Sequence, residues 1–246
     1  MRVADLQLTE SIHSGAVVPV RDDLLANYQR IWHHVGAPGT WWTGRERVAI
    51  AAEVRRARDC ALCAERKAAL SPYAVPGEHE AADLPVAAVE MVHRITTDNQ
   101  RLSRRFHDDA IAGGLTQEQF VETLGVTINV ISADVFCLAL SIPLPPLPEA
   151  QPGEPSRHRP VGPFTTEAWV PMLGQPSGPD ADLWEGFVPN VMRAMSLVPD
   201  EVRNLRARIA PEFVANEHDL LAARSLTRPQ MEFISARVSA LNECFY

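Results

Sequence analysis

Apolar residues recur at helical spacing along most of the chain. In the segment 21–35 they stand at positions 24, 25, 28 and 31, and Gly36 and Pro38 follow the segment. Steps of three and four residues place side chains on one face of an α-helix. The same pattern predicts further helices over residues 43–70, 85–95, 101–112 and 116–140, and a final helix from about residue 227. Apart from a short ambiguous run at 17–20, no segment alternates as a strand does, so the predicted fold class is all-α.

Two of these helices carry a sequence signal for their first residue. Thr43 and Glu46 have the spacing of a capping box, as do Thr116 and Gln119. In this motif the threonine hydroxyl and the side chain three residues later each bind a free backbone N–H of the first turn. We therefore expect one long helix over residues 43–70 and another that begins after Thr116.

A change in composition divides the chain. Eight of the 20 prolines lie between residues 143 and 163. Proline fixes φ and lacks an N–H donor, so this stretch predicts an extended connector. We accordingly expect a helical domain over residues 1–150, a Pro/Gly-rich linker over 151–182, and a second helical unit over 183–246.

The second unit contains a partial repeat of the first. Residues 43–60 align without a gap on residues 227–244, and Thr, Ile, Ala, Val and Cys residues coincide between them. The helices that follow residue 63 in the first copy have no counterpart in the second. The repeat thus predicts about one and a half units, with an exposed apolar face that packs in a homo-oligomer, which we expect to be a dimer.

Composition narrows the class of protein. A net charge of −8 argues against a broad nucleic-acid surface, and four cysteines are too few for a disulfide scaffold. Residues 1–15 lack the apolar core of a signal peptide. The most apolar stretch, residues 120–140, is interrupted by Glu122, Asn129 and Asp134, so we interpret it as a buried helix and expect no membrane partner. These features predict a cytoplasmic protein with reduced thiols.

Cys60 and Cys63 are the strongest candidates for chemistry. Their separation places both sulfurs on one helical face, and Glu53 and Lys67 extend the same stripe. A carboxylate could accept a thiol proton and an ammonium could stabilise the thiolate, which is the reactive form. The pair is expected near the C-terminal end of the 43–70 helix, where the helix dipole disfavours an anion.

Other interpretations of the cysteine pair remain open. Two small cysteines could simply pack in the core, as we expect for Cys137. His79 and His93 could complete a zinc site, but no second compact Cys/His pair follows. Glu90 and His93 have the spacing of a carboxylate-bridged metal site without a matching second set. The sequence therefore predicts neither a metal nor a cofactor.

Residues 21–150 resemble an alkylhydroperoxidase D-like, or carboxymuconolactone decarboxylase-like, helical domain. The resemblance lies in Cys60-x-x-Cys63 and in segments 89–98, 112–122 and 141–146. Residues 183–246 are similar to the opening half of a second such domain. The resemblance implies an all-α fold that oligomerises, and a Cys-x-x-Cys pair that reduces peroxides through a transient disulfide while a glutamate and histidines relay protons.

The proton relay of the family is altered in this chain. Val48 stands at the family's glutamate position, and Leu62 and Lys67 stand where histidines are expected. We therefore assign proton transfer to Glu53 or His93. Cys63 would attack the peroxide and Cys60 would resolve the sulfenic acid, although the sequence does not order the two sulfurs.

The leading hypothesis is a thiol-dependent peroxidase or disulfide oxidoreductase that uses a small-molecule peroxide and a thiol reductant. One alternative is a carboxymuconolactone decarboxylase-like lyase, whose activity would be insensitive to thiol alkylation. The altered relay and the incomplete repeat favour another alternative, a catalytically degenerate oligomeric binding protein.

Overall fold

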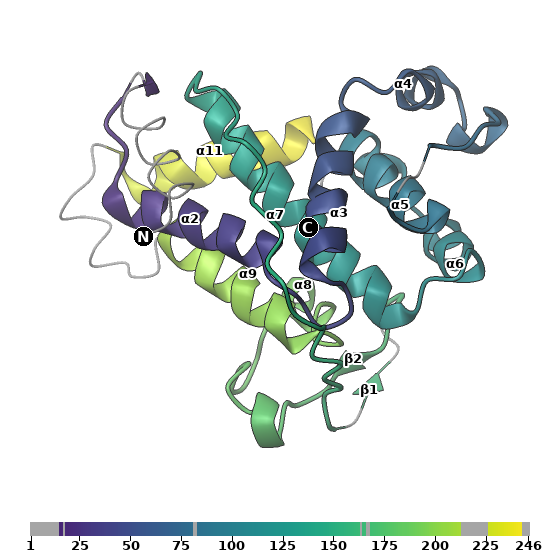
Figure 1. The fold of residues 1–246 in the computed structure, drawn as a ribbon. Helices are drawn as coiled ribbons and strands as arrows, with labels where there is room; N and C mark the ends of the chain where they lie inside the picture. Colours follow the sequence, from purple (N-terminus) through teal and green to yellow (C-terminus); the bar gives the residue numbers. More distant parts are fainter. Residues whose placement is uncertain are drawn as a thin grey trace.

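Helices dominate the structure, which confirms the predicted all-α class. This computed structural model describes residues 15–16, 18–80, 83–162, 164–165, 168–212 and 226–242. Within them the only β structure is a two-stranded antiparallel sheet of β1 (Phe164–Thr165) and β2 (Met172–Leu173). Figure 1 shows this small sheet at the edge of a helical bundle.

Five helices from the first part of the chain form the bundle. They are α2 (Asp22–Gly36), α3 (Gly44–Ala57), α5 (Val86–Thr97), α6 (Arg104–Ala112) and α7 (Gln117–Ala139). α3 packs against both α5 and α7, and α2 packs against α3 and α7. Ile50, Val54, Val92, Val126 and Val130 are fully buried where these helices meet. The bundle core therefore lies around α3 and α7.

Both predicted capping boxes are present. Thr43 and Glu46 bind each other's backbone N–H groups at the start of α3, and Thr116 and Gln119 do so at the start of α7. Each box satisfies donors that the first turn of a helix leaves free. This local chemistry explains why the predicted starts of these two helices lie within one residue of the observed ones.

The prediction of one helix over residues 43–70 was wrong. α3 ends at Ala57, and a separate helix, α4 (Ala61–Ala68), begins after an extended residue, Cys60. Just before the break, Arg55 and Arg58 at the end of α3 both pair with Asp134 of α7, which attaches this end of α3 to the bundle.

Three short 3₁₀ turns lie in the described segments between the helices and strands. They are η1 (Pro72–Ala74), η2 (Asn99–Arg101) and η3 (Gly178–Asp180). The described part of the proline-rich stretch after α7, residues 142–162, has no regular secondary structure. The N–H of Gln151 donates to the carbonyl of the last residue of α2, and those of Ser156 and Arg157 donate to carbonyls of the α2–α3 loop. The proline-rich stretch passes so close to the start of α3 that only glycine fits at position 44. A Cβ there would lie 2.6 Å from the carbonyl oxygen of Gln151.

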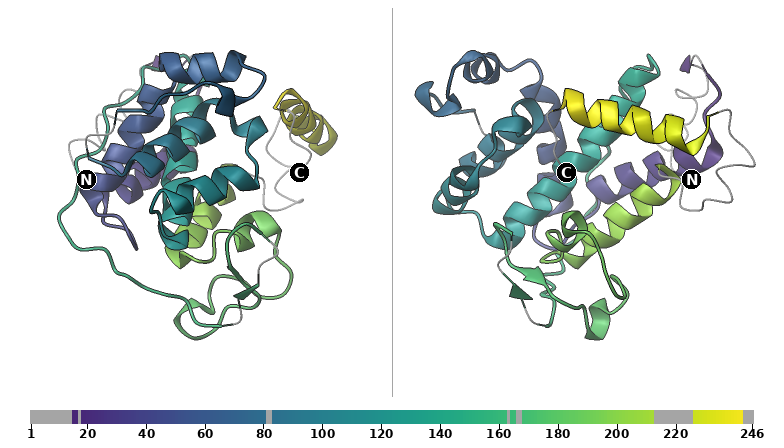
Figure 2. Two further views of the ribbon diagram at one scale, coloured as in Figure 1. Left: turned by 90° about the vertical axis from the view of Figure 1, so that its right-hand side faces the viewer. Right: turned by 180° about the vertical axis from the view of Figure 1, so that it is seen from behind.

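The later helices differ in how they pack. α8 (Asn190–Arg193) is a single turn, whereas α9 (Pro199–Glu212) packs against α2 and α7 and buries Val202 and Leu205 in the common core. α11 (Arg228–Leu241) buries none of its residues. Figure 2 shows α11 on the outside of the bundle.

A buried ionic cluster joins α2, α3, α7 and α9. Arg47 of α3 donates to Glu122 of α7 at 2.6 Å and to Glu201 of α9 at 3.0 Å. His34 of α2 lies 3.0 Å from the same Glu201 carboxylate. All three ionic side chains, Arg47, Glu122 and Glu201, are at least 98% buried. Each charge is therefore removed from water and is stabilised mainly by its oppositely charged partner.

α7 is long and apolar enough to span a membrane by length and composition. However, 61% of its apolar window is buried inside the protein. This burial is typical of a core helix, as the interrupted apolar pattern of residues 120–140 predicted.

Candidate functional site

The two candidate cysteines lie at the start of α4. Cys60 is its N-cap residue and Cys63 belongs to its first turn. Both are free thiols; Cys60 is partly exposed and Cys63 is buried. The sequence-based expectation that the pair lies at a helix C-terminus was therefore wrong. The positive end of the α4 dipole instead favours a thiolate at this position.

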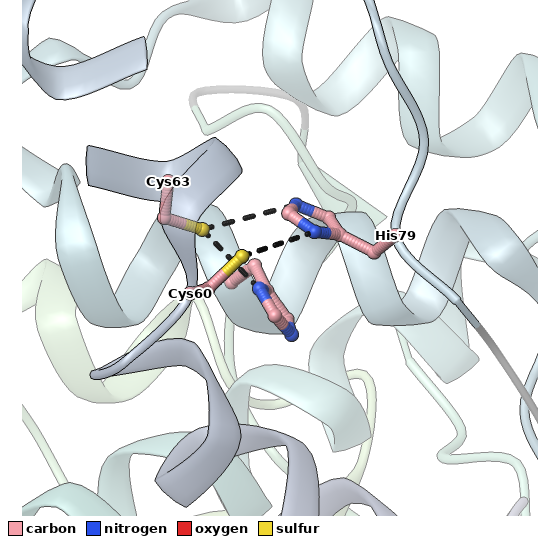
Figure 3. Close-up of side chains that lie close together, drawn as sticks. Cys60, Cys63 and His79 are labelled. Atoms are coloured by element: carbon pink, nitrogen blue, oxygen red, sulfur yellow. Dashed lines mark hydrogen bonds between the residues drawn. The ribbon is translucent and has the colours of Figure 1, made fainter. Parts of the chain in front are cut away.

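Two histidines converge on the sulfurs. His79 comes from the loop before α5, and His93 comes from α5 itself. Cys60 Sγ lies 3.6 Å from His79 Nδ1, and Cys63 Sγ lies 3.8 Å from His79 Nε2 and 3.2 Å from His93 Nδ1. Figure 3 shows both sulfurs directed toward the His79 ring. One donor atom from each of these four side chains lies within 4.8 Å of the other three.

Glu53 lies behind His93. Its carboxylate is 3.1 Å from His93 Nε2 and accepts a 2.6 Å hydrogen bond from Arg56. Glu53 and His93 are both buried. The structure thus brings the four sequence-predicted site residues together. Cys63 contacts His93, His93 contacts Glu53, and Cys60 lies at the start of the same helix as Cys63.

A second histidine–carboxylate pair lies next to the first, because the His79 and His93 rings pack together with centroids 3.8 Å apart. His79 Nε2 is 3.3 Å from Glu90, whose two oxygens both bind the Arg66 guanidinium at 2.8–2.9 Å. Arg66 also donates to the carbonyl of Gly77, which positions the loop that carries His79. Arg66 therefore supports His79 through Glu90 and the loop, whereas Lys67, the cation of the predicted stripe, is exposed.

Sequence reasoning gave these outer residues no role in thiol chemistry. His79 appeared only as a possible zinc ligand, and Glu90 only as part of a different metal motif with His93. Arg66 carried no signal at all. His79 contacts the cysteines directly, and Glu90 and Arg66 reach them only through His79. The spacing of residues along one helix does not encode such contacts between segments.

Burial controls the protonation of the site. Burial raises the pKa of Cys63 to about 12, aided by Cys60 and Glu90 and opposed by a hydrogen bond from Thr97. Burial also lowers the pKa of His79 to about 4, with His93 and Arg66 acting in the same direction and Glu90 against it. At neutral pH His79 is a neutral imidazole and Cys63 keeps its proton until a neighbouring base accepts it.

Comparisons with models of protein families, with curated proteins and with solved structures give no match to this chain.

Proposed function

We propose that this protein is a thiol-dependent peroxidase or disulfide oxidoreductase that uses Cys60 and Cys63. The observation that carries the proposal is the hydrogen-bonded chain from Cys63 Sγ through His93 to Glu53. A thiol, an imidazole and a carboxylate in this order form an activated nucleophile, because the imidazole accepts the thiol proton and the carboxylate stabilises the imidazolium. The resemblance to alkylhydroperoxidase D-like domains supports the same chemistry.

In the first step His93 Nδ1 accepts the proton of Cys63 as the sulfur attacks an oxygen of the peroxide. The O–O bond breaks, the leaving alkoxide receives the proton from His93, and the products are an alcohol and a Cys63 sulfenic acid. Because burial raises the pKa of Cys63 to about 12, a free thiolate is rare at neutral pH. Proton transfer to His93 during the attack avoids that unfavourable state.

In the second step the Cys60 thiol attacks the Cys63 sulfenic acid, and water leaves as the disulfide forms. Two equivalents of an external thiol then reduce the disulfide and become oxidised themselves. Cys60 is the more exposed sulfur, so it is the one that an external thiol reaches first. A supply of small thiols fits a cytoplasmic location for the protein.

Peroxide consumption by cysteine variants tests the proposal. Cys63→Ser should abolish consumption of an organic hydroperoxide, whereas Cys60→Ser should react once and leave a sulfenic acid that dimedone labels at Cys63. Cys137→Ser is the matched control, because Cys137 is also a free buried thiol but lies in α7. Full turnover by the Cys63→Ser variant would overturn the mechanism. Loss of the first step in Cys60→Ser instead would reverse the roles of the two sulfurs.

A second candidate is a catalytically inactive binding protein, which the burial of Cys63 favours. Such a protein would keep its thiols reduced in the presence of excess peroxide. The reduction potential of the pair, measured by equilibration with glutathione, separates the two: a defined potential supports the oxidoreductase, and a pair that never oxidises supports the binding protein. A lyase of the carboxymuconolactone type would keep its activity after thiol alkylation.

A further inference from the structure

We propose that the reduced protein binds one Zn²⁺ ion through Cys60, Cys63, His79 and His93. One donor atom from each residue lies within 4.8 Å of the other three, and three of the four side chains are buried. Thiolate sulfur and imidazole nitrogen are the donors that zinc prefers, and two of each make a complete tetrahedral set. This binding does not depend on peroxidase activity.

The spacing of the donor atoms fits such an ion. Bonds of about 2.3 Å to sulfur and about 2.0 Å to nitrogen, arranged as a tetrahedron, place the donors roughly 3.3–3.8 Å apart. Cys60 Sγ and His79 Nδ1 are 3.6 Å apart, and Cys63 Sγ and His93 Nδ1 are 3.2 Å apart. The two imidazole rings lie against each other, with centroids 3.8 Å apart. All four donor atoms lie within 4.8 Å of one another, so binding an ion requires shifts of about 1 Å to reach tetrahedral spacing and separation of the two rings.

The surroundings of both histidines match those of metal ligands. His93 presents Nδ1 to Cys63 and Nε2 to Glu53. His79 presents Nδ1 to Cys60, and its Nε2 lies 3.3 Å from Glu90 and 3.8 Å from Cys63 Sγ. A histidine that binds a metal through one nitrogen commonly donates its other N–H to a carboxylate, which fixes the ring.

Arginines in turn hold both carboxylates, because Arg56 binds Glu53 and Arg66 binds Glu90. Of the two histidine–carboxylate pairs, the peroxidase steps use only His93 and Glu53. The second pair, His79 and Glu90, has no part in them, and a zinc site gives it a role.

The proposal revises the sequence-based expectation of no metal. That expectation rested on the absence of a second compact Cys/His pair. The two histidines are single residues, and the fold brings them together because one precedes α5 and the other lies within it.

Zinc binding and disulfide formation exclude each other. A disulfide offers no thiolate, so only the reduced pair holds the ion. If the proposed peroxidase chemistry holds, one hydroperoxide and two protons convert the bound dithiolate to a disulfide, giving an alcohol, water and free Zn²⁺. The ion would then protect the thiols and be released by oxidation.

Titration of the full-length, phosphine-reduced chain with Co²⁺ tests the site. We expect one equivalent to produce the thiolate-to-cobalt charge-transfer band and the visible bands of a tetrahedral ion, and Zn²⁺ to remove both. Cys63→Ser should remove the part of the charge-transfer band that the Cys63 thiolate contributes. His79→Asn should weaken Co²⁺ binding at least about 10-fold. Cys137→Ser and His33→Asn are matched controls, because Cys137 is a buried thiol elsewhere and His33 is exposed on α2.

Glu90→Gln keeps the shape of a half-exposed side chain and so tests the site without removing a ligand. Loss of an outer carboxylate typically weakens metal binding about 10–100-fold, and we expect a loss in that range. The proposal is overturned if Co²⁺ gives no charge-transfer band, or if His79→Asn and Glu90→Gln both bind as tightly as the unmodified chain. Metal binding without peroxide consumption would defeat only the proposed function, and peroxide consumption without metal binding would defeat only the zinc site.

Discussion

Glu53 orients His93 in the proposed proton relay. It is buried, it contacts His93 Nε2, and its other oxygen accepts from Arg56. A carboxylate in this place fixes which imidazole nitrogen carries the proton, so that Nδ1 is free to accept the proton of Cys63. The negative charge also stabilises the imidazolium that forms during attack.

Glu53→Gln should therefore slow the reaction of Cys63 with hydroperoxide. An amide removes the charge and can hold His93 in the wrong tautomer, and the assistance at stake is that of general base catalysis, about 100-fold or more. The second-order rate constant of the reduced protein with a hydroperoxide measures the effect. Glu65→Gln is the control, since Glu65 is an exposed residue of α4. An unchanged rate in Glu53→Gln would remove Glu53 from the relay.

At the scale of elements, local chemistry predicted some boundaries and missed others. The starts of α3 and α7 were predictable because capping boxes are encoded by residues three apart. The break between α3 and α4 was not, because residues 57–60 contain neither Gly nor Pro. It lies next to ion pairs from Arg55 and Arg58 to Asp134 of α7, which join segments far apart in the sequence. The placement of His79 likewise depends on Arg66 holding its loop, a contact between segments that no periodicity reveals.

The ionic cluster around Arg47 predicts a pH-dependent stability. Burial alone would raise the pKa of Glu201, but His34 and Arg47 together lower it to about 2, whereas burial raises the pKa of Glu122 despite Arg47. A depressed pKa stabilises the fold above the ordinary pKa of about 4.5, and this stabilisation is lost as the pH falls toward 2. The raised pKa of Glu122 acts in the opposite direction.

Arg47→Leu should lower the free energy of unfolding by about 3–5 kcal/mol at pH 7, because it leaves two buried carboxylates without their cation. The loss should shrink as the pH falls below about 5, since protonation then neutralises both carboxylates. Urea unfolding at several pH values measures it. Arg45→Leu is the control: Arg45 pairs with Asp83 on the surface, and its loss should change stability by less than about 1 kcal/mol. Equal losses of unfolding free energy in the Arg47→Leu and Arg45→Leu variants would show that the buried cluster stabilises the fold no more than a surface ion pair does.

At the scale of the whole molecule, the internal repeat connects the sequence to the packing of α11. α3 and α11 have the same length, and each follows a threonine capping box. In the alignment of residues 43–60 with 227–244, Ile50 corresponds to Ile234 and Val54 to Val238. Ile50 and Val54 of α3 are fully buried, and α3 packs against α5 and α7. Their counterparts in α11, Ile234 and Val238, are 52% and 51% exposed. The apolar face that the core uses in one copy is thus exposed in the other.

An exposed face of this kind predicts self-association, since Phe233 and Leu241 extend it along α11. We expect the chain to sediment as a dimer at micromolar concentration, and the double variant Ile234→Glu with Val238→Glu to sediment as a monomer. Ala236→Glu adds a charge to the opposite side of the same helix and should leave the dimer intact. Because α11 contributes no buried residue to the bundle, the charges should not alter the thermal unfolding of the monomer. A monomeric unmodified chain, or a double variant that remains a dimer, would show that this face does not mediate association.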